Sequence, residues 1–156
     1  MESLEQITQV LNETLVESTG SQTYVTLIAV LVDSVSRKLH CVRAGHLPPL
    51  LFDSNGNSQW LDHGGGLPIG LFQDLKLTVD VYDVPEGSTL VLYTDGITEG
   101  ENAANEHFGA SRLNAVVKTH LEETATGIHH AIRNSLEAFA GERQPTDDST
   151  LVVLKF

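Results

Sequence analysis

The run Thr-Leu-Val-Leu-Tyr at residues 89–93 is apolar at nearly every position. An amphipathic strand alternates apolar and polar residues, whereas a continuous apolar run is typical of a strand that is covered on both faces. Pro85-Glu86-Gly87 precedes the run and is typical of a turn. We therefore predict a strand at 89–93 that is buried on both faces.

The first residues of the chain predict a helix from Ser3 to about Ser18. Ser3 and Gln6 have the spacing of a capping box, and the pair Gly20-Ser21 is expected to end the helix. Four apolar side chains recur at helical spacing and are expected to share one buried face: Leu4, Ile7, Leu11 and Leu15.

The residues between this helix and position 93 predict strands. Residues 23–33 are rich in β-branched side chains, and residues 39–44 have the same character after a polar turn, which indicates an antiparallel hairpin. Residues 50–52 and 59–61 flank Asn55-Gly56, a pair typical of a hairpin tip. Residues 75–82 alternate between apolar and polar side chains.

After residue 100 the apolar spacing becomes helical. Helices are predicted at 108–121 and 126–140, with Gly141 as the cap of the second, and a last strand at 151–154. Strands and helices that are kept apart along the chain favour an α+β fold, with helices packed on antiparallel sheets. We find no internal repeat or linker, so residues 1–156 are expected to form a single domain.

Composition excludes several classes of function. Nine basic against 21 acidic residues give a net charge of −12, which repels nucleic acid and attracts divalent cations, although a role in solubility alone would explain it too. No apolar run is long enough to span a membrane. The single Cys41 permits no internal disulfide, which favours the cytoplasm. The seven histidines lack the spacing of zinc ligands.

Two acidic motifs could carry chemistry. In the first, the strand at 89–93 runs through Thr94 into Asp95, and Gly96 allows a sharp turn and leaves space for an ion. In the second, Asp147 and Asp148 precede the last strand, and a cation would relieve their mutual repulsion. Taken singly, each motif is equally an ordinary turn or capped loop. If the two strands are neighbours, Asp95 and Asp147 converge as hard oxygen ligands for Mg²⁺ or Mn²⁺.

Four segments, in this order, resemble the metal-dependent (type 2C-like, PPM) protein phosphatases, in particular their bacterial SpoIIE and RsbU branch. They are Ala-Gly-His-Leu-Pro-Pro-Leu at 44–50, Gly-Leu-Pro-Ile-Gly-Leu at 66–71, Leu-Tyr-Thr-Asp-Gly-Ile-Thr-Glu at 92–99 and Asp-Asp-Ser-Thr-Leu-Val-Val at 147–153. The second segment has Ile69 where the family usually has leucine.

The resemblance implies an α-β-β-α sandwich and a hydrolase of phosphoserine or phosphothreonine that uses Mn²⁺ or Mg²⁺. In the family, two cations share a hydroxide that attacks the phosphoryl group directly. Asp95 and Asp147 match family metal ligands, Gly96 matches the turn residue, and Asp148 is expected to orient the site. His46 is either a structural histidine, which we favour, or a residue near the phosphate. The branch implies a signalling role and a phosphorylated anti-sigma-factor antagonist as substrate.

The family's first metal motif, an aspartate followed by a Gly-His-Gly-like turn, has no equivalent in this sequence. The resemblance therefore covers the carboxy-terminal portion of the domain, with its amino-terminal part incomplete, and we expect an excised fragment. Missing strands would expose sheet edges, so a homodimer is a secondary expectation. The alternative function is a catalytically impaired module for protein interaction or dimerisation.

Overall fold

The computed structural model describes residues 3–20, 23–144 and 147–156. They form two compact units: unit 1 comprises Met1–Pro48 and Asp62–Val84, and unit 2 comprises Pro49–Leu61 and Pro85–Phe156. Helices and antiparallel sheets occur together, which confirms the predicted α+β class. The single-domain organisation stays a prediction. No helix within the described ranges is long and apolar enough to cross a membrane.

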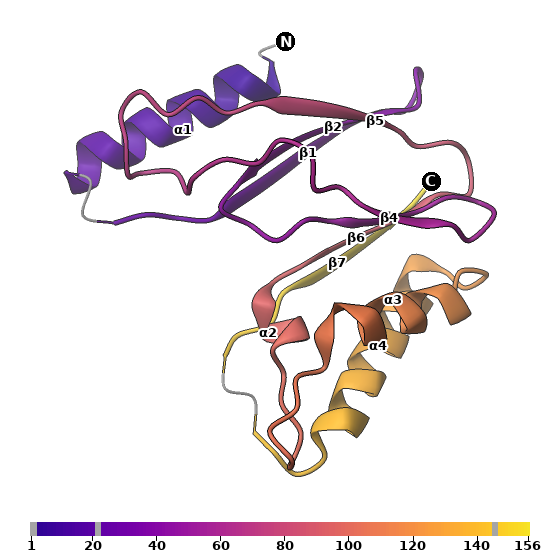
Figure 1. Ribbon diagram of the computed structural model, residues 1–156. Helices are drawn as coiled ribbons and strands as arrows, with labels where there is room; N and C mark the ends of the chain where they lie inside the picture. The colour runs from indigo at the N-terminus through magenta and orange to yellow at the C-terminus, as the bar shows by residue number, and fades with distance from the viewer. Residues whose placement is uncertain (1–2, 21–22, 145–146) are drawn as a thin grey trace. The chain divides into compact units, whose positions relative to one another are not determined.

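Unit 1 is a three-stranded antiparallel sheet with one helix packed on it (Figure 1). Its strand order is β1-β2-β5, with β1 (Leu27–Asp33) at one edge, β2 (Lys38–Ala44) in the centre and β5 (Val79–Asp83) at the other edge. The helix α1 (Leu4–Thr19) contacts β1 and β2. The predicted hairpin of the first two strands is therefore confirmed.

Helix α1 begins and ends as its sequence predicts. The Ser3 side chain accepts a hydrogen bond from the Gln6 backbone N–H at 3.2 Å, and the Gln6 side chain accepts one from the Ser3 N–H at 2.9 Å. This is the capping box. Gly20 ends the helix in a left-handed conformation with φ of 61°; Ser21, the other residue of the predicted ending, lies outside the described residues.

The predicted buried face of α1 is wrong in part. Ile7 and Leu11 are 43% and 46% exposed, whereas Thr8 and Asn12 are fully buried. Leu4 and Leu15 do pack against the core of unit 1. Apolar spacing alone placed Ile7 and Leu11 inside, but the helix is rotated so that its polar Asn12 faces the protein.

Asn12 holds α1 against the loop that precedes β5. Its Oδ1 accepts a hydrogen bond from the Gly70 N–H at 2.9 Å, and its Nδ2 donates to the Phe72 carbonyl at 3.0 Å. Gly70 has φ of 95°, and a Cβ there would collide with the backbone oxygen of Thr23. A buried amide satisfied on both ends is a favourable use of a polar residue in a core.

The first and fifth strands are shorter than predicted. Strand β1 begins at Leu27 rather than at residue 23, and β5 begins at Val79 rather than at residue 75. Before β1, Val25 makes only an isolated bridge to Ile69. Before β5, apolar side chains of an irregular segment, Leu75 and Leu77, enter the core. Burial without strand pairing therefore explains the apolar pattern there.

Unit 2 is a four-stranded antiparallel sheet in the order β4-β3-β6-β7. The hairpin of β3 (Leu50–Phe52) and β4 (Ser58–Trp60) confirms the prediction around Asn55-Gly56. In β6 (Thr89–Tyr93) every residue but the half-buried Leu92 is buried, as its apolar run predicts. Strand β7 (Leu151–Lys155) closes the other edge, next to β6.

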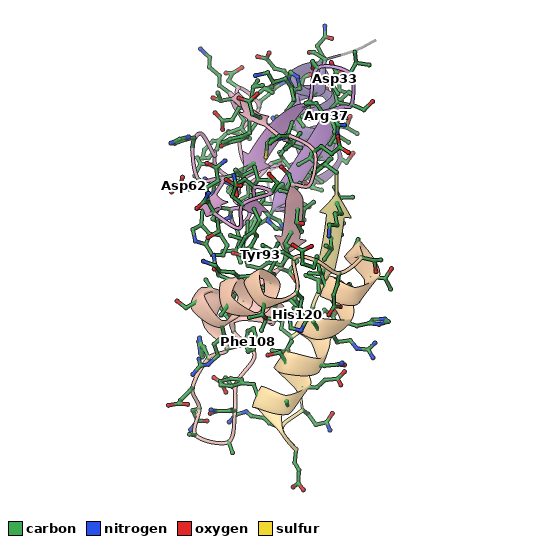
Figure 2. All side chains as sticks on the ribbon, turned by 90° about the vertical axis from the view of Figure 1, so that its right-hand side faces the viewer. Asp33, Arg37, Asp62, Tyr93, Phe108 and His120 are labelled. Carbon is green, nitrogen blue, oxygen red and sulfur yellow. The ribbon has the colours of Figure 1, made fainter. Side chains whose placement is uncertain are left out.

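Two helices, α3 (Gly109–Thr119) and α4 (Ala125–Ala140), provide the rest of the core of unit 2, as predicted to within two residues at each end. Thr124 caps α4 by accepting a hydrogen bond from the Gly127 N–H at 3.1 Å, and Gly141 ends it. Figure 2 shows Phe108 at the start of α3. The core is apolar throughout: Leu50, Phe52, Val91, Tyr93, Ile97, Phe108, Leu113, Val117, Ile128 and Ile132.

Replacing Asn12 with alanine is expected to lower the free energy of unfolding by about 2–3 kcal/mol, because the buried Gly70 N–H would lose its partner and the Phe72 carbonyl would lose its hydrogen bond to Asn12. Chemical denaturation followed by circular dichroism measures this change. Glu17→Ala, an exposed change on the same helix, is the control and is expected to stay within about 0.5 kcal/mol. Equal stabilities for the two variants would contradict the role given to Asn12.

Cys41 is buried in β2, and burial raises the pKa of its thiol to about 11. The thiolate is the reactive form, so at pH 8 the folded chain is expected to react far more slowly with a thiol reagent than an exposed cysteine of pKa about 8.5. Labelling with and without denaturant measures the difference. Immediate stoichiometric labelling of the folded chain would contradict a buried, structural thiol.

Candidate functional site

The two acidic motifs lie at one end of the paired strands β6 and β7, which run side by side to α2 in Figure 1. Tyr93, the last residue of β6 and labelled in Figure 2, pairs with Leu151. Pairing continues one residue further, because the Thr94 N–H donates to the Thr150 carbonyl at 3.1 Å and the Thr150 N–H donates to Thr94 Oγ1 at 2.8 Å. The condition set for a shared cation site, that the two strands are neighbours, is therefore met.

Asp95 is the first residue of the short helix α2 (Asp95–Thr98), which the sequence predicted only as a turn. Its side chain is exposed, and its Oδ1 accepts a hydrogen bond from the Gly96 N–H at 3.0 Å. Ile97 is buried in the core of unit 2 and fixes this helical turn. Strand β6 and the buried side chain of Ile97 together hold the Asp95 backbone at the end of the sheet.

Asp147 and Asp148 lie in the loop that leads into β7, and both are exposed. Asp147 Oδ1 accepts a hydrogen bond from the Asp148 N–H at 2.8 Å, the same local arrangement as at Asp95. Thr146, which begins this motif, lies outside the described residues.

The backbones of the two motifs touch at Gly96. A Cβ on Gly96 would collide with the Asp148 carbonyl oxygen, and would lie 3.0 Å from the Asp148 carbonyl carbon and 3.2 Å from Ser149 Cα. Gly96 does not have a positive φ, so a left-handed backbone conformation is not what requires the glycine, and the space that it was expected to leave for an ion stays a prediction. The glycine is required because the Asp148 backbone fills the space where a side chain would be.

The arrangement offers hard oxygen atoms for a divalent cation. Within the described residues, neither Asp95 nor Asp147 uses its Oδ2 in a hydrogen bond. Two carboxylates suit one hydrated Mg²⁺ or Mn²⁺, since such ions keep several waters. No group of three His, Cys, Asp or Glu side chains in ranges 3–20, 23–144 and 147–156 is arranged to hold a metal. The residues present thus fit one hydrated ion, and a two-ion site needs further donors.

His46 lies in unit 1, directly after β2, and the four other predicted residues lie in unit 2. One of its ring nitrogens, Nδ1, is 3.0 Å from the Leu47 carbonyl oxygen, and its own carbonyl accepts a hydrogen bond from Arg43 at 3.0 Å. These contacts are local and agree with the structural role favoured from the sequence. A role near a phosphate stays a prediction.

Sequence reasoning missed two residues of this region. Thr94 occupies the N-cap position of α2, but its Oγ1 accepts a hydrogen bond from the Thr150 N–H, just before β7, and does not cap the helix. Arg143 lies in the sequence between α4 and Asp147. It binds the turn that follows α2, at residues 101–105. For Arg143, the only indication in the sequence was the polar turn Glu-Asn-Ala-Ala-Asn at 101–105, which offers acceptors for an arginine.

Gly96→Ala is expected to destabilise the chain by about 1–3 kcal/mol, because the added methyl group meets backbone atoms that only a shift of the acidic loop can clear. The matched control is Gly66→Ala, whose methyl group would meet the flexible end of Leu77 at 3.3 Å. Denaturation of both variants gives the comparison. A Gly96→Ala chain as stable as wild type would show that the two backbones do not meet here.

Two curated relatives are phosphatases. The chain is 27% identical over 131 residues to the phosphoserine phosphatase RsbP of Bacillus subtilis, which covers 84% of this chain and 30% of RsbP. It is 23% identical over 150 residues to the phosphoserine phosphatase RsbU of the same organism, covering 96% of this chain and 44% of RsbU. The chain therefore spans less than half the length of either relative.

Solved structures show the same fold. The SiaA PP2C domain of Pseudomonas aeruginosa matches with a TM-score of 0.81 and 21% identity, over 93% of this chain and 57% of that one. A manganese-presoaked phosphatase domain of the cell fate determinant SpoIIE from B. subtilis matches with a TM-score of 0.69 and 18% identity, over 100% of this chain and 75% of that one.

A comparison with protein families agrees with the resemblance that the four sequence segments indicated. Residues 2–156 match the family "Stage II sporulation protein E (SpoIIE)". This match covers both acidic motifs and both units, and it confirms the resemblance inferred from the four segments. The chain belongs to the SpoIIE family of PP2C-type phosphatase domains.

Proposed function

We propose that this chain forms part of an Mn²⁺- or Mg²⁺-dependent phosphatase that removes phosphate from phosphoserine or phosphothreonine in a protein. The observation that carries the proposal is the contact between the Gly96 and Asp148 backbones, by which the two acidic motifs meet at one end of the paired strands β6 and β7. RsbP and RsbU, the relatives described above, support the reaction class because both are phosphoserine phosphatases.

In this proposal Asp95 and Asp147 hold the cation, and Asp148 orients the site. The chemistry that such a cation supplies is a lowered pKa for the attacking water and neutralisation of charge on the phosphoryl oxygens. The protein contributes position: the backbone pairing of β6 with β7, which continues to Thr94 and Thr150, brings the segments of the two aspartates to the same end of the strands. Their exposure leaves room for a phosphorylated protein segment to approach.

The substrate we propose is a phosphorylated regulatory protein of the anti-sigma-factor antagonist type, in the cytoplasm of a bacterium. Support comes from the resemblance to the RsbU branch and from the identity with RsbP and RsbU. A strongly acidic chain suits a protein substrate better than a nucleic acid.

A second candidate is an interaction or dimerisation module with little turnover. It is favoured by the large apolar side chains that unit 1 exposes on α1 and on its edge strand β1, among them Val10 and Leu31. It also agrees with the finding that the described residues hold no cluster of three metal ligands.

Asp95→Asn is expected to remove manganese-dependent hydrolysis of an aryl phosphate or a phosphoserine peptide by a factor of at least about 100, since even outer-shell partners of metal ligands cost 10–100-fold. The same variant is expected to weaken Mn²⁺ binding measured by calorimetry, because one of two proposed ligands is lost. Asp147→Asn is expected to behave alike.

Asp83→Asn is the matched control, because it makes the same chemical change at an exposed carboxylate in unit 1, paired with Lys38. It is expected to leave both Mn²⁺ binding and hydrolysis unchanged. Hydrolysis and Mn²⁺ affinity that are equal in wild type and Asp95→Asn would reject the enzymatic proposal. Concentration-dependent self-association without Mn²⁺ binding would favour the second candidate.

A further inference from the structure

Strand β1 is an edge of the sheet of unit 1, and it is apolar at every position from Leu27 to Val32. A continuous apolar run of this kind is typical of a strand that is covered on both faces. No residue of β1 is buried, however, and Leu31 is 43% exposed. In β6, which has a similar run, every residue but one is buried. The apolar surface of β1 is therefore left uncovered within the described residues.

The backbone of β1 has a free side as well. Ala44 of β2 pairs with Leu27 on one side and bridges to Gly66 on the other, where the Gly66 N–H donates to the Arg43 carbonyl at 2.8 Å. Successive residues of a strand direct their N–H and carbonyl groups to opposite sides. Ala44 therefore bonds to Leu27, and every second residue of β1 from Leu27 faces β2. The residues between them direct their N–H and carbonyl groups out of the sheet: Ile28, Val30 and Val32. Within the described residues these groups have no hydrogen-bond partner.

The other edge strands are protected in ways that β1 is not. Proteins block the addition of a foreign strand with short edges, charged side chains or proline. Strand β4 has only three residues, β5 carries Asp80 and Asp83, and β7 ends in Lys155. Residues 27–32 contain no charged residue, proline or glycine. Among the described edges, β1 is the one most open to another strand.

We propose that β1 pairs with β1 of a second copy of this chain, antiparallel and about a twofold axis, so that two three-stranded sheets become one. In the register with the longest overlap, Val30 lies opposite Val30 of the other copy, Ile28 opposite Val32, and Leu27 opposite Asp33. The three outward residues of each strand then form six hydrogen bonds between the copies. This inference goes beyond the proposed phosphatase activity and does not depend on it; it gives the second candidate function a defined surface.

Strand β1 is complementary to itself, which favours a second copy over an unrelated partner. β-Branched side chains fit opposite one another on a pleated sheet, and this register pairs Ile28 with Val32 and Val30 with itself. Asp33 lies opposite the apolar Leu27, so no like charges meet within the strand pair. A twofold pairing also uses both free edges, so that it ends in a dimer rather than in an open fibre.

The net charge of −12 opposes the association of two copies. Salt screens this repulsion, since the Debye length decreases from about 10 Å at 0.1 M to about 3 Å at 1 M ionic strength. Dimerisation through an uncharged strand is therefore expected to strengthen between about 0.1 and 1 M NaCl. An interface built on ion pairs would weaken over the same range.

Sedimentation velocity of the full chain over a range of concentrations measures the association, and wild type is expected to show a monomer–dimer equilibrium. Val30→Lys is expected to weaken dimerisation at least about tenfold, because two ammonium groups would meet at the twofold axis. Val35→Lys is the matched control, because it makes the same change at a 93% exposed valine in the turn after β1. It is expected to dimerise as wild type does.

Val30→Pro tests the hydrogen bonds without adding a charge. Because the Val30 N–H points out of the sheet, proline at this edge position removes no hydrogen bond from the folded chain, but it removes two from the dimer. The variant is expected to keep the circular dichroism spectrum and the Mn²⁺ binding of wild type and to dimerise about tenfold more weakly.

Single cysteines test the register. Opposite residues of a hydrogen-bonded antiparallel pair have Cα atoms about 5.5 Å apart, which suits a disulfide. Val30→Cys is therefore expected to form a disulfide-linked dimer under mild oxidation. Ile28→Cys, on the same edge, is not, because the two cysteines would lie four residues apart along the paired strands, roughly 13 Å. The native Cys41 is buried and does not compete.

Wild type that stays monomeric at both salt concentrations would overturn the proposal and leave the edge to a strand of a different protein. Equal dimerisation of Val30→Lys and Val35→Lys, equal cross-linking of the two cysteine variants, or species larger than a dimer would overturn it too. Should Val30→Lys fail to fold, Val30→Pro and the cysteine pair provide the decision. None of these results bears on the phosphatase proposal, which Asp95→Asn tests through Mn²⁺ binding.

Discussion

The antiparallel ladder between β6 and β7 is the interaction on which the candidate site depends. Asp95 and Asp147 are far apart in the sequence, and this ladder, continued by the contacts of Thr94 with Thr150 and of Gly96 with Asp148, brings their segments together. Its strands belong to the middle and to one edge of the sheet of unit 2, and the apolar core beneath them contains Val91, Tyr93 and Ile97. Burial of these side chains therefore stabilises the same backbone that presents the acids.

This placement has an electrostatic cost that a cation would offset. The backbone segments that carry Asp95, Asp147 and Asp148 lie at the same end of β6 and β7, in a chain of net charge −12. Like charges held close together repel, and the repulsion decreases when a divalent ion binds. In the proposed function, this repulsion in the metal-free chain would be the counterpart of affinity for the ion, a pattern that is common at functional sites.

Features set by neighbouring residues could be predicted from the sequence. The capping box of Ser3, the hairpin around Asn55-Gly56 and the buried strand at 89–93 each depend on local spacing, and each was confirmed. The pairing of β6 with β7 was only a condition for the expected site, and the structure meets it. The metal-binding roles of Asp95 and Asp147 stay predictions, because no metal ligand geometry follows from the strands alone.

Features that depend on distant partners could not be predicted. The buried face of α1 is determined by Asn12, whose partners lie at residues 70–73, and apolar spacing gave no indication of them. The need for glycine at position 96 comes from a backbone in another segment. In the sequence, Arg143 is an ordinary charged residue after a helix. Its contacts with Glu101, Asn102 and Asn105 become visible only in the structure.

Paramagnetic broadening by Mn²⁺ in NMR spectra of the isotope-labelled chain tests the central claim most directly, because the effect falls steeply with distance from the bound ion. The account predicts that a small amount of Mn²⁺ broadens the amide signals of residues 95–97 and 147–149 before all others, and that Asp95→Asn abolishes this selectivity. Broadening that begins elsewhere, or that affects only one of the two segments, would contradict a shared cation site.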